Sequence, residues 1–198
     1  AAAAQLRKTR RAYRALVRFV DDQVGRVLSS LDEQGLLDST VVLFTSDHGD
    51  LLGDHLRLQK SSPYRESLTV PLAIRLPGGA ARGPAESGTT RHEAPVELTD
   101  ITATILDCAG LDPGEALAKP WPAFHGRVPC RSLVPVLRGE RERVRDFTFS
   151  ECRGDWQCIQ DDTHKYVRWL DYDAPGSARE ELYDLTSDPD ELSPLRFT

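Results

Sequence analysis

The sequence contains no methionine, no excess of basic residues and no long apolar run. Its net charge is -6, and its arginines are interleaved with Asp and Glu, so no basic stripe is available to a nucleic-acid backbone. No apolar run approaches the roughly 20 residues that span a bilayer. We therefore expect neither a nucleic-acid partner nor membrane insertion.

The absence of methionine also bears on where the chain begins. A chain without Met cannot start at its own initiation codon unless the initiator was removed, and the run Ala1 to Ala4 resembles a trimmed start. We therefore expect a fragment or a processed chain from which an N-terminal half is missing. Localisation, cytoplasmic or secreted, is left open for the same reason, as is assembly into a homo-oligomer.

Cysteine is scarce, and the Cys-x-x-Cys pairs of structural zinc sites are absent. Two cysteines flank the turn signal Gly154-Asp155 and could face each other across a hairpin. The spacing favours free or disulfide-bonded structural cysteines over a zinc site with His164. The four are Cys108, Cys130, Cys152 and Cys158.

The composition, 39% hydrophobic and 28% charged, is that of a globular protein. Apolar residues recur in steps of three or four from Tyr13 to Leu31, which predicts an amphipathic helix that ends near Gly35. The apolar and β-branched residues 41–45 predict a strand buried on both faces of a parallel sheet. A helix followed by such a strand indicates half of an α/β unit.

The rest of the chain predicts further elements. Residues 70–76 indicate a second strand, and Thr99 or Asp100 is expected to cap a helix that ends at Gly110. That helix would place Ile101, Ile105 and Leu106 on one side. Also expected are an exposed loop at 80–93, a linker at 111–130, a helical turn at 132–137, and an antiparallel sheet from 147–151, 156–160, 165–170 and 181–185.

A polar turn, Ser46-Asp47-His48-Gly49-Asp50, follows the 41–45 strand directly. Ligands of open α/β sheets bind beyond the carboxyl ends of the strands. Asp offers a hard oxygen and His an imidazole nitrogen, while Gly49 lets the backbone turn so that both side chains reach one ion. Taken alone, such a short turn is more often a polar loop with a capping Asp and an exposed His.

Together with its surroundings, this turn resembles the sulfatase family of the alkaline-phosphatase-like superfamily. The similarity spans nearly the whole chain, although no single motif in it would be sufficient. It includes Val24-Gly25-Arg26-Val27-Leu28, the Ser-Asp-His-Gly turn, Gly53-Asp54-His55, Lys60, Val70-Pro71-Leu72, Leu98-Thr99-Asp100-Ile101, Ser132-Leu133, Lys165-Tyr166 and Asp188-Pro189.

The resemblance implies roles for four residues. Asp47 and His48 would be ligands of one divalent metal ion, expected to be calcium, and Lys60 would bind the substrate's sulfate as a catalytic group. Such an ion polarises an ester oxygen, and a lysine ammonium neutralises charge on sulfuryl oxygens. His55 is a candidate for substrate binding, or a residue that supports the site by hydrogen bonding. Without the family context, Lys60 would more often be a solvated loop lysine.

The family's nucleophile is a formylglycine made from Cys or Ser in a C/S-x-P-x-R motif of the N-terminal half, and none of the cysteines here begins one. The segment Ser61-Ser62-Pro63-Tyr64-Arg65 matches literally. It follows the substrate lysine instead of lying far upstream, so we interpret the match as coincidence. The family's paired metal Asp residues and its proton-transfer His and Lys are also missing. The chain alone is therefore expected to be catalytically incomplete.

The predicted fold class is α/β: part of a mixed sheet flanked by helices, followed by a small C-terminal antiparallel sheet. Residues 1–110 would belong to the catalytic domain, 111–146 to a linker and 147–198 to a C-terminal subdomain. The predicted function is metal-dependent hydrolysis of sulfate esters, with formylglycine supplied by the missing half. The alternatives are a phosphonate monoester hydrolase or phosphodiesterase of the superfamily, for which the nitrogen ligand His48 favours manganese or zinc, and a structural fragment.

Overall fold

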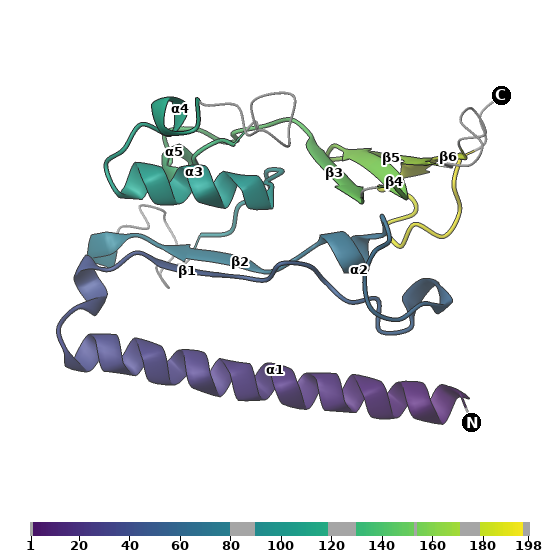
Figure 1. The fold of residues 1–198 in the computed structure, drawn as a ribbon, viewed down its shortest axis with the longest axis horizontal. Helices are drawn as coiled ribbons and strands as arrows, with labels where there is room; N and C mark the ends of the chain where they lie inside the picture. Colours follow the sequence, from purple (N-terminus) through teal and green to yellow (C-terminus); the bar gives the residue numbers. More distant parts are fainter. Residues whose placement is uncertain (1, 80–89, 119–129, 153, 171–178, 196–198) are drawn as a thin grey trace. The chain divides into compact units, whose positions relative to one another are not determined.

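The computed structural model describes residues 2–79, 90–118, 130–152, 154–170 and 179–195 (Figure 1). Contacts divide the chain into two compact units. The first contains Ala1–Ser61 and Glu66–Ala80, and the second contains Ser62–Arg65 and Ala81–Thr198. The domain boundaries at 110 and 146 stay a prediction.

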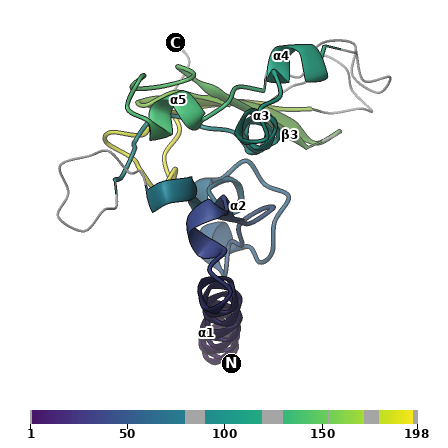
Figure 2. The ribbon, with the colours of Figure 1, turned by 90° about the vertical axis from the view of Figure 1, so that its left-hand side faces the viewer.

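The first unit opens with α1 (Ala2–Glu33), seen along its length in Figure 1 and end-on in Figure 2. The helix ends where it was predicted to end. Gly35 has φ 66°, the amide of Leu36 donates to the carbonyl of Leu31, and the amide of Gly35 donates to that of Asp32. These two bonds form a Schellman motif, whose left-handed residue is most favourable as glycine.

The predicted strands of this unit form, but not in the expected sheet. β1 (Val42–Thr45) pairs antiparallel with β2 (Leu72–Arg75), with Thr45 opposite Leu72. Within the described residues, the expectation of a parallel strand buried on both faces is wrong, because β1 has this one antiparallel neighbour and Phe44 is 40% exposed. A β-branched run indicates a strand but does not determine the direction of its neighbour.

Arginines tie α1 and the turn that follows it to the rest of the unit. Arg10 donates its Nε to the carbonyl of Leu52 at 2.7 Å and pairs with Asp54 at 2.9 Å. Arg75 on β2 pairs with Asp38 at 2.7 Å, within the turn η1 (Leu37–Ser39). The remaining short elements are η2 (Asp54–Leu56), α2 (Arg65–Leu68) and η3 (Pro77–Gly79).

Much of the apolar side of α1 remains open. Leu16 is 63% exposed, Val20 48% and Val27 61%. Periodicity therefore predicted the helix correctly, while the described residues leave much of its apolar face uncovered. None of the described helices is both long and apolar enough to cross a membrane.

The second unit contains a four-stranded antiparallel sheet, which confirms the predicted C-terminal sheet. Its order is β3 (Thr148–Cys152), β4 (Trp156–Gln160), β5 (His164–Trp169) and β6 (Glu180–Asp184). Alternate residues of β4, β5 and β6 form a buried face that includes two charged side chains. These residues are Trp156, Cys158, Lys165, Val167, Glu181 and Tyr183.

The strand register separates the cysteines. Cys158 lies opposite Ser150, and Cys152 lies opposite Trp156, so the expectation that the two cysteines face each other is wrong. All four cysteines are free thiols. Burial raises the pKa of the Cys158 thiol to about 11, which keeps it neutral and unreactive at neutral pH.

The helix α3 (Leu98–Cys108) begins two or three residues earlier than expected. Its cap is Glu97, whose amide donates to the Asp100 carboxylate at 2.9 Å, and not Thr99 or Asp100. The fully buried residues of α3 are Asp100, Ala103 and Thr104, while Ile105 is 54% exposed. The predicted apolar side of α3 therefore identified its buried face only in part, because the charged residue Asp100 occupies a buried position.

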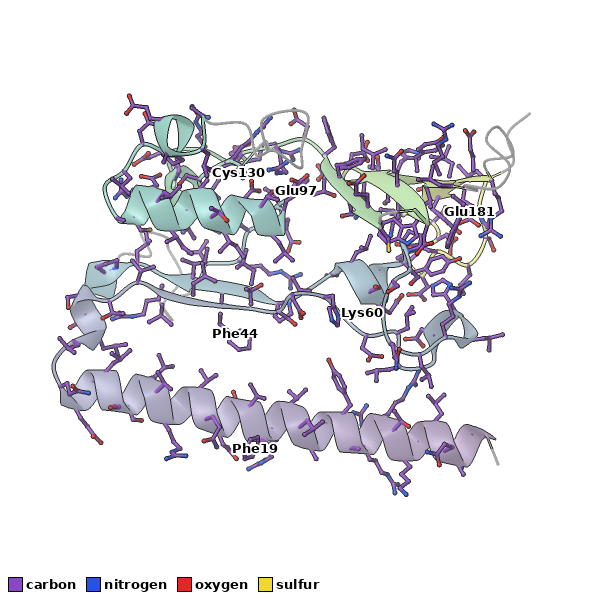
Figure 3. The ribbon with its side chains drawn as sticks, viewed as in Figure 1. Phe19, Phe44, Lys60, Glu97, Cys130 and Glu181 are labelled. Atoms are coloured by element: carbon purple, nitrogen blue, oxygen red, sulfur yellow. The ribbon has the colours of Figure 1, made fainter. Side chains whose placement is uncertain are left out.

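An ionic network explains how Asp100 can be buried. Its carboxylate accepts from the Arg145 guanidinium, at 2.9 Å from Nε, and from the amide of Arg131 at 2.8 Å. Arg145 also pairs with Glu97, labelled in Figure 3, at 2.9 Å. Buried charges are tolerated when they are paired and hydrogen-bonded in this way. The network joins α3 to the segment that leads into β3.

The connections in this unit are partly described. The predicted linker contains a short helix, α4 (Pro113–Ala116), and the predicted helical turn forms as α5 (Val134–Leu137). Residues 80–89 and 119–129, within the predicted loop and linker, lie outside the described residues.

Candidate functional site

The turn predicted to carry the site leaves β1 at Ser46. The Ser46 hydroxyl donates to the carbonyl of His48 at 3.0 Å, and the amide of Gly49 donates to the carbonyl of Ser67 at 2.8 Å. A Cβ atom on Gly49 would lie only 1.9 Å from the carbonyl oxygen of Glu66. The turn is therefore packed against the backbone of α2, and a glycine is required at this position.

Gly49→Ala is accordingly expected to destabilise the protein by about 1–3 kcal/mol, the usual cost of overpacking. The obstructing atom belongs to the backbone, so no side-chain rotation can relieve the clash. Thermal unfolding measures the effect. Gly25→Ala is the matched control, because nothing lies within 4 Å of its added Cβ and alanine favours a helix. Equal melting temperatures for Gly49→Ala and the unmodified protein would contradict the close packing of Gly49 against Glu66.

The chain after the turn brings Lys60 back to it. The Asp50 carboxylate accepts from the amides of Leu52 at 2.8 Å and Gln59 at 3.2 Å. The amide of Leu51, a fully buried residue, donates to the carbonyl of Gln59 at 2.8 Å. Because Gln59 is fixed beside the turn, the next residue, Lys60, reaches His48 across 12 positions of sequence.

The side chains of His48 and Lys60 meet. Nζ of Lys60, labelled in Figure 3, lies 2.7 Å from Nε2 of His48, whose Nδ1 lies 2.7 Å from the carbonyl oxygen of Gly49. A carbonyl oxygen only accepts, so Nδ1 carries the hydrogen and Nε2 offers a lone pair. The Lys60 ammonium donates to that lone pair, which is also the one that a metal ion would use.

Asp47 presents a carboxylate beside this pair. Its side chain is 81% exposed, and its Oδ2 lies 3.4 Å from His48 Nε2. Desolvation is the largest single influence and acts to raise the pKa of Asp47, but the interaction with His48, hydrogen bonds from the amides of Asp47 and His48, and the charge of Lys60 together lower it. The carboxylate is therefore ionised at neutral pH, the form that binds a cation.

Two of these atoms fit one divalent ion. Adjacent oxygen ligands at about 2.3–2.6 Å and at right angles lie about 3.3–3.7 Å apart, close to the 3.4 Å between Asp47 Oδ2 and His48 Nε2. Among the described residues, no group of three or more His, Cys, Asp or Glu side chains could hold a metal ion. A full coordination sphere would therefore need ligands beyond this group.

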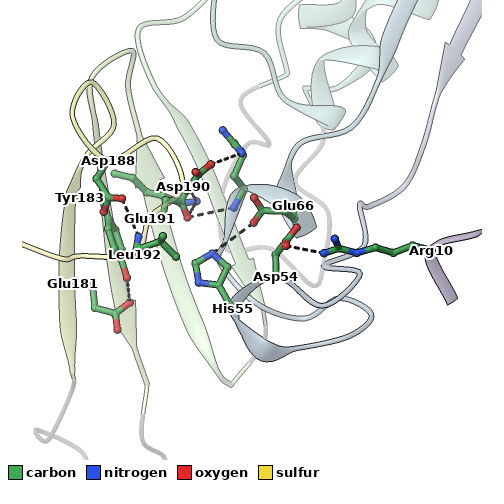
Figure 4. Close-up of polar contacts among 12 residues, drawn as sticks. Arg10, Asp54, His55, Glu66, Glu181, Tyr183, Asp188, Asp190, Glu191 and Leu192 are labelled. Atoms are coloured by element: carbon green, nitrogen blue, oxygen red, sulfur yellow. Dashed lines mark hydrogen bonds and ion pairs between the residues drawn. The ribbon is translucent and has the colours of Figure 1, made fainter. Parts of the chain in front are cut away.

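His55 lies close to the carboxylate of Glu66. Its side chain is 11% exposed, and its Nε2 lies 3.7 Å from Oε2 of Glu66, as the dashed line in Figure 4 shows. His55 has φ 50°, a left-handed conformation that is uncommon for a residue other than glycine. Asp47, His48 and Lys60 are thus brought together, whereas a substrate-binding role for His55 stays a prediction.

Sequence reasoning missed the residues that hold these groups in place. Asp50 lies within the predicted motif but was given no role, and the contact of Glu66 with Gly49 is made by backbone atoms. Arg10 lies 42 residues from Leu52, whose carbonyl it binds. No local spacing signals a contact of that kind.

Comparison with known proteins decides the family. The sulfatase family model matches residues 2–111, more than half of the chain. The chain belongs to the sulfatase family. An arylsulfatase of Clostridium perfringens (strain 13 / Type A) is 31% identical over 195 residues, which cover 96% of this chain and 36% of that protein. The sulfatase chain thus spans about a third of the length of the relatives that it matches.

Solved structures confirm the α/β, alkaline-phosphatase-like fold class. One, solved in complex with its substrate D-glucosamine-2-N,6-O-disulfate, has a TM-score of 0.69 and 28% identity, covering 90% of this chain and 34% of that one. The phosphonate monoester hydrolase of Agrobacterium radiobacter has a TM-score of 0.64 and 30% identity, covering 88% of this chain and 34% of that one. Proteins with this fold thus include one whose substrate is a disulfated glucosamine and one named as a phosphonate monoester hydrolase.

Proposed function

We propose that this sulfatase chain supplies part of the active site of a metal-dependent sulfuric ester hydrolase. The observation that carries the proposal is the convergence on His48 Nε2, which lies 3.4 Å from Asp47 Oδ2 and 2.7 Å from Lys60 Nζ. A carboxylate and an imidazole suit a divalent cation, and the neighbouring ammonium suits an anionic ester. Membership of the sulfatase family supports the same assignment.

In this mechanism, Asp47 Oδ2 and His48 Nε2 would hold one divalent ion, expected to be calcium. The chemistry that such an ion would supply is polarisation of an ester oxygen and orientation of the nucleophile. Lys60 leaves His48 and donates to a sulfate oxygen, where its charge stabilises the transition state for cleavage of the ester S–O bond. The hydrogen bonds that the Asp50 carboxylate accepts from the amides of Leu52 and Gln59 keep the backbone before Lys60 in place.

The nucleophile in this proposal is a formylglycine outside these 198 residues. No cysteine here begins the required motif, and Ser61 adjoins the lysine proposed to bind the sulfate. A nucleophile must instead stand within about 3–3.5 Å of the reacting atom and in line with the leaving group. The isolated chain is therefore proposed to be inactive, and Ser61 to remain unmodified.

A phosphonate monoester hydrolase is the second candidate. It is favoured by the nitrogen ligand His48, which manganese or zinc accepts more readily than calcium does. The 30% identity to the phosphonate monoester hydrolase of Agrobacterium radiobacter supports the same alternative.

The deciding experiment assays the full-length gene product on 4-nitrophenyl sulfate and on a 4-nitrophenyl phosphonate monoester, with elemental analysis of its metal. We expect kcat/KM for the sulfate to be higher by about tenfold or more, a difference of about 1.4 kcal/mol in transition-state binding, together with bound calcium. The reverse preference, with manganese or zinc, would establish the alternative. A folded, metal-loaded protein that hydrolyses neither ester would support a structural role.

A further inference from the structure

The segment Ser62–Arg65, which contains most of the literal S-x-P-x-R match, belongs to the second unit although its sequence neighbours belong to the first. Ser62 and Pro63 are fully buried. The Tyr64 ring packs against that of Trp169 on β5, with centroids 6.4 Å apart. These four residues therefore form a fixed segment of the second unit, two positions after Lys60.

The backbone of this segment is held by a buried carboxylate. Glu191 Oε2 accepts from the amide of Arg65 at 3.2 Å (Figure 4). Both oxygens of the same carboxylate also bind Lys165 Nζ, at 2.8 and 2.9 Å. The side chains of Lys165 and Glu191 are 0% and 2% exposed. An ion pair this deeply buried requires complete pairing, and here one carboxylate satisfies both an ammonium and a backbone donor.

The turn that carries Glu191 is itself constrained. Glu191 has φ 56°, a conformation rarely adopted by residues with a side chain. The Asp188 carboxylate accepts from the amides of Leu192 at 3.0 Å and Ser193 at 2.8 Å, so it fixes the chain on the far side of Glu191. Strained residues of this kind persist only where the surrounding structure determines them strongly.

We propose that Glu191, with its partner Lys165, is a positioning residue for Lys60. Lys60 follows Gln59, which is fixed by Asp50 and Leu51, and precedes Ser62–Arg65, which is fixed by Glu191. Only Ser61 separates Lys60 from this segment, so a segment held by Glu191 restricts the backbone conformations open to Lys60. The inference rests on the proposed role of Lys60 as the lysine that binds the substrate's sulfate.

The test uses the double substitution Lys165→Met/Glu191→Leu in the full-length gene product. Replacing a buried ion pair by apolar side chains usually preserves a fold, so the acceptor for the Arg65 amide is removed without an unpaired buried charge. We expect amide hydrogen exchange across residues 60–65 to become at least about tenfold faster, while peptides from β4 and β5 keep their exchange rates. Unchanged exchange across 60–65 would overturn the anchoring.

If the double variant fails to fold, Glu191→Gln provides the same test. Its single carboxamide oxygen must serve both the Lys165 ammonium and the Arg65 amide, so a smaller acceleration across 60–65 is expected, and its absence again overturns the proposal. Asp190→Asn is the matched control. It removes the exposed pair between Arg65 and Asp190, whose side chains are 47% and 65% exposed, and should leave the exchange unchanged.

Kinetics separate positioning from general stability. We expect the double substitution to lower kcat on the sulfate ester at least about tenfold, and to cause no further loss in a Lys60→Ala background, because both changes act through the same ammonium. An additional loss in that background would overturn positioning through Lys60. A different result would be faster exchange across 60–65 in the double variant together with an unchanged kcat in Lys60→Ala. That result would show that the anchor exists and that the proposed function is wrong.

Discussion

Asp47→Ala is expected to abolish sulfate-ester hydrolysis by the full-length gene product and to lower its affinity for divalent metal by about 100-fold or more. Loss even of residues that only orient metal ligands costs about 10–100-fold, and Asp47 is the only carboxylate of the ligand pair proposed here. Its side chain is 81% exposed, so removing it leaves no cavity in a core. The fold should therefore survive the substitution.

Metal content after dialysis and initial rates on an aryl sulfate measure this effect. Asp38→Ala is the matched control, because Asp38 is also an exposed carboxylate, 89% accessible and paired with Arg75, in the same unit. It should retain both metal and activity. Unchanged metal content and turnover in Asp47→Ala would exclude Asp47 as a ligand.

The sequence predicted elements better than it predicted what covers them. The steps of three and four from Tyr13 to Leu31 identified α1, and Gly35 its end. The same pattern implied a buried face, yet Leu16 and Val27 are exposed. Periodicity describes a segment's own apolar side, whereas burial needs a second surface. This chain spans about a third of its relatives' length.

Buried charged residues were the other feature that the sequence did not predict. Alternation along a strand assigns charged residues to the solvent side, but Lys165 lies on the inner face of β5 because Glu191 meets it there. Asp100 is buried on α3 because Arg145 reaches it. The partners are far apart in the sequence: 26 residues separate Lys165 from Glu191, and 45 separate Asp100 from Arg145. No local sequence pattern links two residues at such separations. Only the fold brings such partners together.

The parts of the candidate site that are adjacent in sequence were predictable, whereas contacts between distant residues were not. Asp47 and His48 are adjacent, so a motif was enough to suggest them. Lys60 was found from its order in the family's sequence, but its contact with His48 depends on hydrogen bonds that close the loop through Asp50 and Gln59. The donors in those bonds are backbone amides, which every residue except proline has, so the identity of Gln59 does not reveal the contact.

Lys60→Ala is expected to lower kcat by about 10²–10³-fold, the effect of removing one charge-stabilising donor worth about 3–4 kcal/mol in the transition state. The side chain is exposed, so the melting temperature should barely change. Lys60→Arg should recover only part of the rate, because it restores the charge with a broad planar group in place of a compact ammonium. Steady-state rates with an aryl sulfate are to be measured for the unmodified protein, Lys60→Ala and Lys60→Arg.

Metal content then distinguishes this lysine from Asp47. In the structure, Lys60 Nζ donates to the same Nε2 lone pair of His48 that a metal ion would take. Removing the ammonium therefore removes a competitor and a repelling charge, so Lys60→Ala should bind metal at least as tightly as the unmodified protein, while Asp47→Ala binds it less well. Loss of metal from Lys60→Ala would mean that the lysine supports the ligands. A near-normal rate would make it a surface lysine without a catalytic role.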